Sequence, residues 1–303
     1  MSGVSRPLQD ERFSGHESFV CRYGWLPKLH QAILSDPLAL KDEAQATITL
    51  GIGRNMVKSI QFWGEAFGVI EGRKDGGLQP GPLGRLVLSN DGWDPYLEQP
   101  ESLWLFHWWI ATHAEVAVWN LVFGSTNYSR FDRKNLISGL GDRADKSGKK
   151  LAASTLEQHA SIFLHSYKRE DSASDDTSWC PLQDLGLFEY VTADDGRTIY
   201  LVGRNAPLGL SPRVFLFALI DYFARQNSTT LGLSQIVHGD FSPGSVFRLD
   251  EFQVKSLLEG IEHEFGGVIR FVDTADTQQV ILEHARLPGW AECLSAAGEE
   301  LNV

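Results

Sequence analysis

The hydrophobic pattern between residues 47 and 88 changes from helical spacing to that of a hairpin. Five apolar residues recur at intervals of three and four, on one face of a helix over about 54–67: Met56, Val57, Ile60, Trp63 and Phe67. A shorter helix over 42–50 precedes it, across a turn bracketed by Gly51 and Gly53. Residues 69–70 and 86–88 have the composition of two strands, joined by the Gly- and Pro-rich tip GRKDGGLQPGP. This order predicts a winged helix-turn-helix.

The polar face of the predicted second helix carries side chains suited to nucleic acid. Candidate DNA contacts on the helix and at the hairpin tip are Arg54, Asn55, Lys58, Ser59, Gln61, Arg73 and Lys74. Arg54 or Asn55 would contact bases, whereas Lys58 and Ser59 would contact phosphates. The alternative is a protein-binding winged helix, in which the same face is simply solvated.

Residues 93–226 have a mostly helical pattern. The predicted helices cover 102–123, 154–167 and a segment starting at Ser211 and Pro212; Ser154 and Glu157 form a capping-box pair. Charged segments at 141–150 and 168–178 are predicted as surface loops or disorder.

Residues 227–285 repeat the opening pattern more faintly. A short helix over 233–237 and an acidic amphipathic helix over 249–265 precede a hairpin, VIRFV–DTADT–QQVIL. The acidity of this second helix favours a docking or dimer role over DNA contact. The last residues, 288–303, are expected to form a short helix or a frayed end.

These elements predict a mainly α protein with small β wings, in the α+β class. We expect three domains: 1–92 with the winged helix-turn-helix, a helical middle domain over 93–226, and a winged-helix-like unit over 227–303.

The net charge of −12 over 303 residues limits any DNA affinity to a local surface. Residues 51–90 hold five cations and three anions, so this segment differs in sign from the whole. Three scattered cysteines and an N-terminus without an apolar core predict a reducing, cytoplasmic location. The apolar run at 103–111 continues into polar positions, so we expect a buried helix and no membrane span.

The N-terminal segment holds the densest cluster of reactive side chains, namely His16, Glu17, Cys21 and Arg22. A catalytic or metal role would use His16 and Cys21, but the spacing matches no zinc pattern. A structural role is favoured: Ser14 and Glu17 would form a capping box ahead of a helix over 25–34. His107, His113 and the tryptophans of 104–119 are predicted to lie in the core.

The opening FSGHESFVCRYGWLPKL resembles a bacterial family of unknown function whose members begin with an FSGHESF-type signature. Four later blocks resemble the same family in the same order: GIGRNMVKSIQFWGEAFGVI, DPYLEQPESLWLFHWWIA, PLQDLGLFEY and PGSVFRLDEFQV. The resemblance implies a place in prokaryotic defence islands, beside proteins like phosphoadenosine-phosphosulfate reductase that are linked with DNA phosphorothioation. It supplies no catalytic residues.

Three hypotheses follow. The first is a DNA-binding accessory or regulatory subunit of a defence or DNA-modification system, with duplex DNA and proteins of the same island as partners, and a homodimer as a further candidate. The second is a scaffold for a sulfurtransferase-like or ATPase partner without DNA contact. The third is an unrecognised nuclease or sulfur-transfer enzyme. Because the sequence contains no Walker, Rossmann, GxSxG or HExxH motif, we expect no enzyme of a common class, no cofactor and no metal site.

Overall fold

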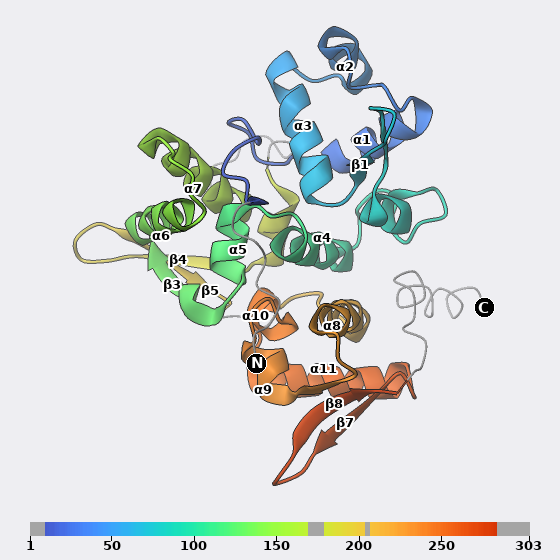
Figure 1. Cartoon of the computed structure of the whole chain (residues 1–303), viewed down its shortest axis with the longest axis vertical. Helices are drawn as coiled ribbons and strands as arrows, with labels where there is room; N and C mark the ends of the chain where they lie inside the picture. The colour runs from blue at the N-terminus through green and yellow to red at the C-terminus, as the bar shows by residue number, and fades with distance from the viewer. Residues whose placement is uncertain (1–9, 169–178, 204–206, 284–303) are drawn as a thin grey trace.

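The computed structural model describes residues 10–168, 179–203 and 207–283. Helices and small antiparallel sheets form a mixed α+β architecture (Figure 1). The expected class, mainly α with small β elements, is confirmed at this level. Within the described residues, helices followed by a hairpin occur three times along the chain. The division of the chain into the three predicted domains stays a prediction.

The first unit contains α1 (Trp25–Ser35), α2 (Glu43–Leu50), α3 (Arg54–Ala66) and the hairpin β1 (Ile70–Gly72) and β2 (Leu78–Pro80). Asp42 caps α2 by accepting hydrogen bonds from the N–H groups of Ala44 and Gln45. Gly51 ends α2 with φ +63°, a conformation that costs glycine little. The three helices predicted in this region are therefore confirmed.

The second strand of this hairpin lies earlier than predicted. Ile70 pairs with Pro80, and Gly72 with Leu78. Residues 86–88, the predicted strand, lie instead in the short helical segment η2 (Gly84–Leu88). At Gly84 an added Cβ would lie 2.1 Å from the carbonyl oxygen of Val69, so only glycine allows the chain to fold back this closely.

The single helix predicted over 102–123 is two helices, α4 (Pro100–Thr112) and α5 (Ala117–Phe123). Between them Glu115 has φ +54°. Its carbonyl accepts a hydrogen bond from the Arg12 N–H, and the Ala117 N–H donates to the Arg12 carbonyl. In a continuous helix, these backbone groups would form hydrogen bonds within the helix. Here they bond to Arg12 instead, at the point where the helix is interrupted between α4 and α5.

The middle unit contains a sheet that the sequence pattern did not predict. Its elements are β3 (Arg130–Asp132), α6 (Arg133–Lys146), α7 (Ala153–Tyr167), η4 (Pro181–Leu185), β4 (Phe188–Thr192) and β5 (Thr198–Val202). The strand order is β3-β5-β4. The prediction of a surface loop over 141–150 was wrong through residue 146, because α6 covers it. Residues 169–178 of the other predicted loop lie outside the described residues.

The third unit contains α8 (Pro212–Gln226), β6 (Thr230–Gly232), α9 (Leu233–His238), α10 (Pro243–Phe247), α11 (Glu251–Glu264), β7 (Ile269–Asp273) and β8 (Gln278–Leu282). The predicted helices and hairpin are confirmed, whereas β6 and α10 were not predicted. The strand order, β6-β8-β7, places the last strand of the hairpin in the centre, as in the middle unit. The predicted tail at 288–303 lies outside the described residues.

One of the three predicted helix caps is confirmed. The Ser211 hydroxyl accepts from the Val214 N–H at the start of α8, where Pro212 occupies the first turn. The Ser154–Glu157 capping box was wrong, because α7 begins after Ala152 without a side-chain cap. The Ser14–Glu17 box was also wrong, because α1 begins after Gly24 and Glu17 has φ +51°.

The core that joins the units is aromatic and contains a hydrogen-bonded chain. The Trp119 indole N–H donates to the Tyr167 hydroxyl, which lies 2.7 Å from Nδ1 of His107. Nε2 of His107 lies 3.0 Å from the Val246 carbonyl oxygen and donates to it. Burial lowers the pKa of His107 to about 4, so this histidine is neutral. It is the core histidine expected from the sequence.

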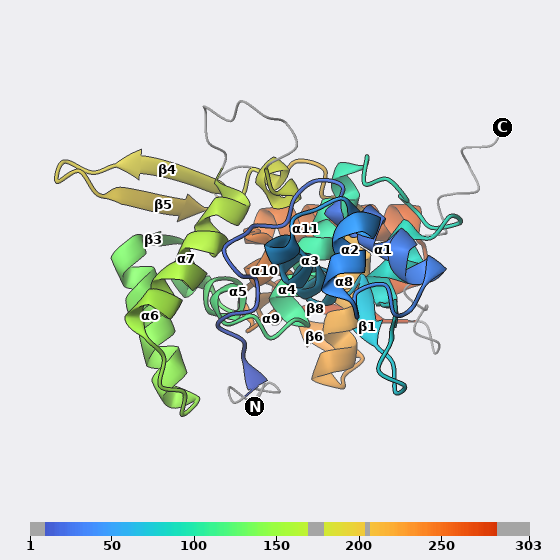
Figure 2. The same ribbon diagram turned by 90° about the horizontal axis from the view of Figure 1, so that it is seen from above.

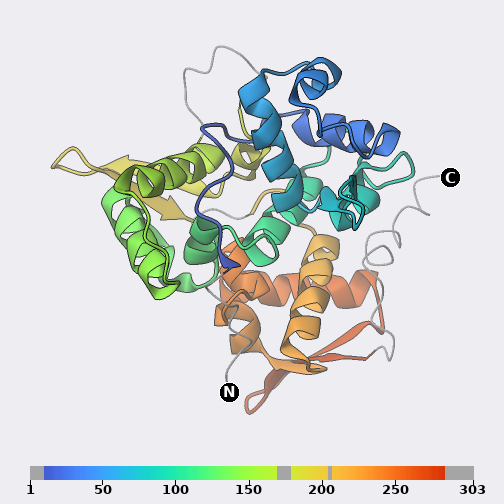
Figure 3. The same cartoon turned by 45° about the horizontal axis from the view of Figure 1, so that its top comes forward.

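Residues 10–24, here called the N-terminal strap, contain no α-helix and pass between α3 and α7 (Figures 1 and 3). Figure 2 shows the molecule from above, with the β4–β5 hairpin projecting beyond α6 and α7. The strap thus lies between the first unit and the middle unit.

Candidate nucleic-acid interface

The apolar side of α3 is fixed in the core. Val57, Ile60 and Trp63 are buried, and the Trp63 indole N–H donates to the Phe19 carbonyl oxygen of the strap. Gly64 faces α1 at very short range: an added Cβ would lie 2.3 Å from Cδ2 of Leu29. Because this face is so closely packed, the opposite face of α3 has a defined orientation.

The opposite face begins with three exposed polar residues, Arg54, Asn55 and Lys58. Nζ of Lys58 lies 3.7 Å from Oε1 of Glu43, but the two side chains are 65% and 45% exposed, so the ion pair is weak. Within the described residues, no hydrogen bond or ion pair is formed by the side chains of Arg54 and Asn55. All three lie in the first turns of α3, where the helix dipole also favours an anion.

Two predicted contact residues have other roles. Ser59 is fully buried, and its hydroxyl lies 3.0 Å from the His16 carbonyl oxygen and 3.4 Å from that of Phe19. It cannot reach a phosphate, so Ser59 is removed from the candidate set. Gln61 is partly buried, and its amide donates to the Glu65 carboxylate at 3.0 Å, which places it at the edge of the candidate face.

The hairpin tip with Arg73 and Lys74 is exposed, and its base lies against the connection between α1 and α2. The Leu78 N–H donates to the Pro37 carbonyl oxygen, so β2 lies against the end of α1. Arg73 forms a 2.8 Å ion pair with Asp75. The tip is therefore held against the α1–α2 connection, and within the described residues no hydrogen bond or ion pair joins these two cations to the Arg54 face.

His16 of the N-terminal strap bridges the first and middle units. Its carbonyl accepts from Ser59 of α3, and its Nε2 lies 2.9 Å from Nδ1 of His159 in α7. The Val118 N–H donates to Nε2 of His159, so the proton of this ring is on Nδ1 and is donated to His16. Nδ1 of His16 must then carry a proton, which is donated to the Glu17 carbonyl oxygen at 2.7 Å. Both rings are neutral, and burial lowers the pKa of each.

The other cluster residues do not converge on this pair. Cys21 is buried, and burial raises the pKa of its thiol well above the usual value, so the reactive thiolate is disfavoured. The Arg22 guanidinium lies over the rings of Phe19 and Trp25. Glu17 is exposed. Among the described residues, no three His, Cys, Asp or Glu side chains are placed to hold a metal ion.

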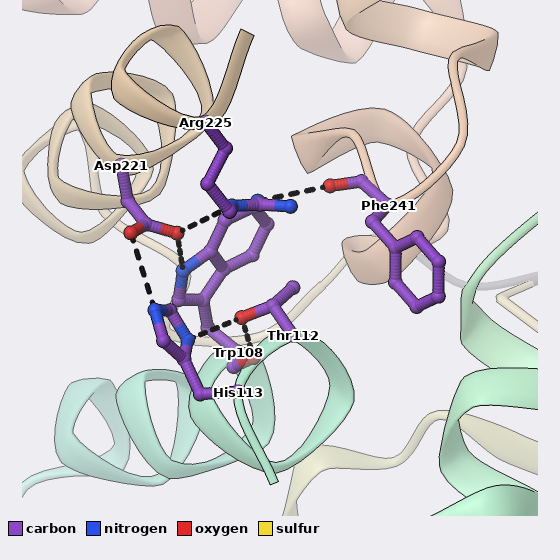
Figure 4. Close-up of polar contacts among 6 residues, drawn as sticks. All are labelled: Trp108, Thr112, His113, Asp221, Arg225 and Phe241. Carbon is purple, nitrogen blue, oxygen red and sulfur yellow. Dashed lines mark hydrogen bonds and ion pairs between the residues drawn. The ribbon is translucent and has the colours of Figure 1, made fainter. Parts of the chain in front are cut away.

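A second polar cluster joins α4 to α8 (Figure 4). The buried Asp221 carboxylate accepts from the Trp108 indole at 3.1 Å and from Arg225 at 3.1 Å, and lies 3.3 Å from Nε2 of His113. Burial alone would raise the pKa of Asp221, but the hydrogen bond and charge of His113, with the charge of Arg225, lower it below the usual value.

The chain of contacts from Thr112 through His113 to Asp221 resembles that of a nucleophile, a base and an orienting acid. The Thr112 hydroxyl lies 2.9 Å from Nδ1 of His113. Thr112 is fully buried, however, and its hydroxyl donates to the Trp108 carbonyl oxygen at 2.6 Å. Because a substrate cannot reach this hydroxyl, the cluster joins two helices and is not a reaction centre.

Sequence reasoning missed the polar face of α7. Ser154, Gln158, Ser161 and His165 recur at intervals of four, three and four on its solvent side. The predicted capping box assigned Ser154 and Glu157 to the end of the helix. Because residues 141–150 were predicted as a loop, the neighbouring helix α6 was not predicted. The signal in the sequence was the basic composition of residues 130–150, which lead directly into α7 and its polar face.

The chain belongs to the family described as "Protein of unknown function (DUF4007)", whose model matches residues 13–297. No curated protein is significantly similar to it. Two solved structures share its fold. A magnesium ion-bound SspB crystal structure matches with a TM-score of 0.81 and 24% identity, covering 97% of this chain and 96% of SspB. A second SspB crystal structure matches with a TM-score of 0.81 and 23% identity over 98% and 97%. Within the described part of the chain, no helix has the length and apolar character needed to cross a membrane.

Proposed function

We propose that the protein is a DNA-binding accessory or regulatory subunit of a prokaryotic defence or DNA-modification system of the phosphorothioation type. The observation that carries the proposal is the exposed group Arg54, Asn55 and Lys58 at the start of α3. Guanidinium, amide and ammonium groups are the side chains that contact base edges and phosphates. The first unit, with α2, α3 and the β1–β2 hairpin, is interpreted as a winged helix-turn-helix with α3 as the recognition helix.

The cellular association rests on the FSGHESF signature and is supported by the SspB-like fold. The strap gives this signature a physical role, because its His16 contacts both α3 and α7. The proposed partners are duplex DNA and proteins encoded in the same island, and the proposed location is the cytoplasm. Self-association as a homodimer stays a prediction.

The magnesium ion named in one SspB structure raises the question whether this chain has a matching site. Mg²⁺ prefers carboxylate oxygens in octahedral geometry. Among the described residues, no group of three or more His, Cys, Asp or Glu side chains is placed to hold a metal ion. We therefore assign no step to a metal.

The test is an electrophoretic shift with phosphorothioate-modified and unmodified duplexes at low salt. We expect the wild type to shift duplex DNA and the Arg54→Glu, Lys58→Glu double variant to lose the shift. The matched control is Lys28→Glu, Lys41→Glu, which makes the same charge change at two exposed residues outside α3. No shift by the wild type, or an unchanged shift by the α3 variant, contradicts the assignment of α3.

A scaffold role is the second candidate, favoured by the surface of α11. Phe252 on this helix is 80% exposed, and Glu251, Glu259 and Glu262 of the same helix are also exposed. An exposed aromatic ring beside carboxylates suits a protein partner better than DNA. Co-purification with an island-encoded protein, lost on Phe252→Ser and accompanied by no DNA shift, would replace the first proposal with this one. For the nuclease or sulfur-transfer alternative we propose no residues, because Cys21 is buried.

A further inference from the structure

We propose that α7, the α6–α7 connection and the start of α6 form a second contact surface for duplex DNA, separate from α3. The proposal rests on the proposed function, that the chain binds duplex DNA, and it names a surface that the sequence pattern did not predict.

The charge of this segment is the first argument. Residues 130–168 hold eight cations and four anions, a larger excess than residues 51–90 have, in a chain of net charge −12. Arg130, Arg133, Lys134 and Lys150 are all exposed. Of these charges, Asp132 is buried and bound to Arg197 at 2.6 Å, and Arg143 is paired with the buried Glu11, so neither adds much to the surface field. A local positive field attracts phosphates even on an acidic protein.

The solvent face of α7 supplies groups that can read bases. Ser154, Ser161 and His165 lie on this face and border a hollow of about 420 Å³ together with Ser18 of the strap and Arg133. Gln158 is held in place, because its amide donates to the Glu17 carbonyl oxygen at 2.8 Å, which leaves its carbonyl oxygen as an acceptor. Hydroxyl, amide and imidazole groups can bond to base edges. Glu157 is the carboxylate on this face, and the charge excess outweighs it.

A second hollow, of about 650 Å³, adjoins the first between α6 and β5. Lys134, Arg197 and Tyr200 line it, and Arg133 and Glu157 line both hollows. Arg197 is 59% exposed, despite its ion pairs with Asp132 and Asp195. Cations beside a helix with a polar face are the arrangement in which phosphate contacts fix the register of base contacts.

The third unit provides an internal comparison. It has the same order of strand, helices and hairpin, with the last strand central, but its corresponding helix α11 is acidic. The topology alone therefore does not make a DNA surface. The middle unit differs in its exposed cations and in the uncharged polar face of α7. The assignment of a DNA contact surface rests on these two features.

The test measures binding of a duplex of about 20 base pairs, roughly two helical turns, to the full chain. The variant is Lys134→Glu, Lys150→Glu, since both side chains are exposed and neither forms a hydrogen bond or ion pair with another described residue. We expect at least about tenfold weaker binding and a salt dependence shallower by about 2 in log–log slope, one for each lost phosphate contact. Lys28→Glu, Lys41→Glu serves again as the charge-matched control and should change affinity by less than about twofold, as expected for cations outside the phosphate contacts.

Hydroxyl-radical footprinting distinguishes direct contact between this surface and DNA from a long-range electrostatic effect of its cations. We expect the wild type to protect two stretches of the duplex backbone, of which Lys134→Glu, Lys150→Glu loses one and Arg54→Glu, Lys58→Glu the other. If the α3 variant weakens binding and the α6–α7 variant does not, the second surface is refuted and the proposed function stands. Preference for single-stranded RNA over the duplex also refutes the second surface. If the wild type binds no duplex at low salt, the proposed function itself fails.

Discussion

Nε2 of His16 lies 2.9 Å from Nδ1 of His159, and the two rings are stacked with an interplanar angle of 13°. His16 belongs to the signature segment and His159 to α7, so this contact joins the N-terminal strap to the middle unit. Only a neutral pair satisfies the hydrogen bonds on both sides. An added proton would place one N–H opposite another.

The first prediction is that folding stability falls in mild acid. Burial lowers the pKa of His16, His159 and His107 in the folded state, whereas an unfolded histidine has a pKa of about 6.5. The unfolded state therefore binds protons first, so stability is fully present above about pH 7 and decreases as pH falls below about 6.5. Urea unfolding at several pH values measures this.

Replacing both His16 and His159 measures how much of the loss of stability in mild acid comes from this pair. His16→Gln, His159→Gln should lower stability at neutral pH but reduce its further loss towards acid. A double variant with the full wild-type decline would show that the pair is not the titrating element.

The second prediction concerns the buried carboxylate of the strap. Glu11 is 2% exposed and bonds to Arg143 of α6 and to the Asn120 amide. Arg143→Ala leaves this charge without its cation, so we expect about 3 kcal/mol of lost stability in chemical unfolding. Arg270→Ala, at the exposed pair with Glu283, should cost less than about 1 kcal/mol. Equal effects of the two changes would remove Glu11 as an anchor of the strap.

The third prediction tests the contact between α3 and α1. Gly64→Ala places a methyl group 2.3 Å from Cδ2 of Leu29 and 3.0 Å from Cγ1 of Ile70, so we expect about 1–3 kcal/mol of lost stability and weaker DNA binding. At Gly141 in α6 the same Cβ meets its nearest atom at 3.8 Å, and Ala should be neutral or stabilising there. A Gly64→Ala protein as stable as the wild type would show that α1 and α3 can separate freely.

The long amphipathic helices could be predicted because burial imposes a period on them. α3 and α11 follow that rule, and both were predicted to within about two residues. The β4–β5 hairpin of the middle sheet was missed, although its two strands have five residues each and lie close together in sequence. The strand β3 could not be predicted in the same way, because it has three residues and its partner β5 lies far away in sequence. A pattern of three residues does not distinguish a strand from a loop.

The candidate site was predicted in part for a related reason. Exposure of Arg54, Asn55 and Lys58 follows from the helical period, because they lie away from the buried stripe. Ser59 has the same polar character but is buried, because the strap, 40 residues earlier in the chain, offers it two carbonyl oxygens. Such a partner is set by tertiary structure and leaves no local signal in the sequence.

The central claim is that α3 binds DNA through Arg54 and Lys58, and the salt dependence of affinity tests it most directly. Fluorescence anisotropy of a labelled duplex, titrated at several salt concentrations, gives log Kd against log salt. The account predicts a steep increase of Kd with salt for the wild type, and a slope lower by at least about 1 for Arg54→Glu, Lys58→Glu, because the Lys58 phosphate contact is lost. A wild-type slope near zero, or the same slope in the variant, would contradict it.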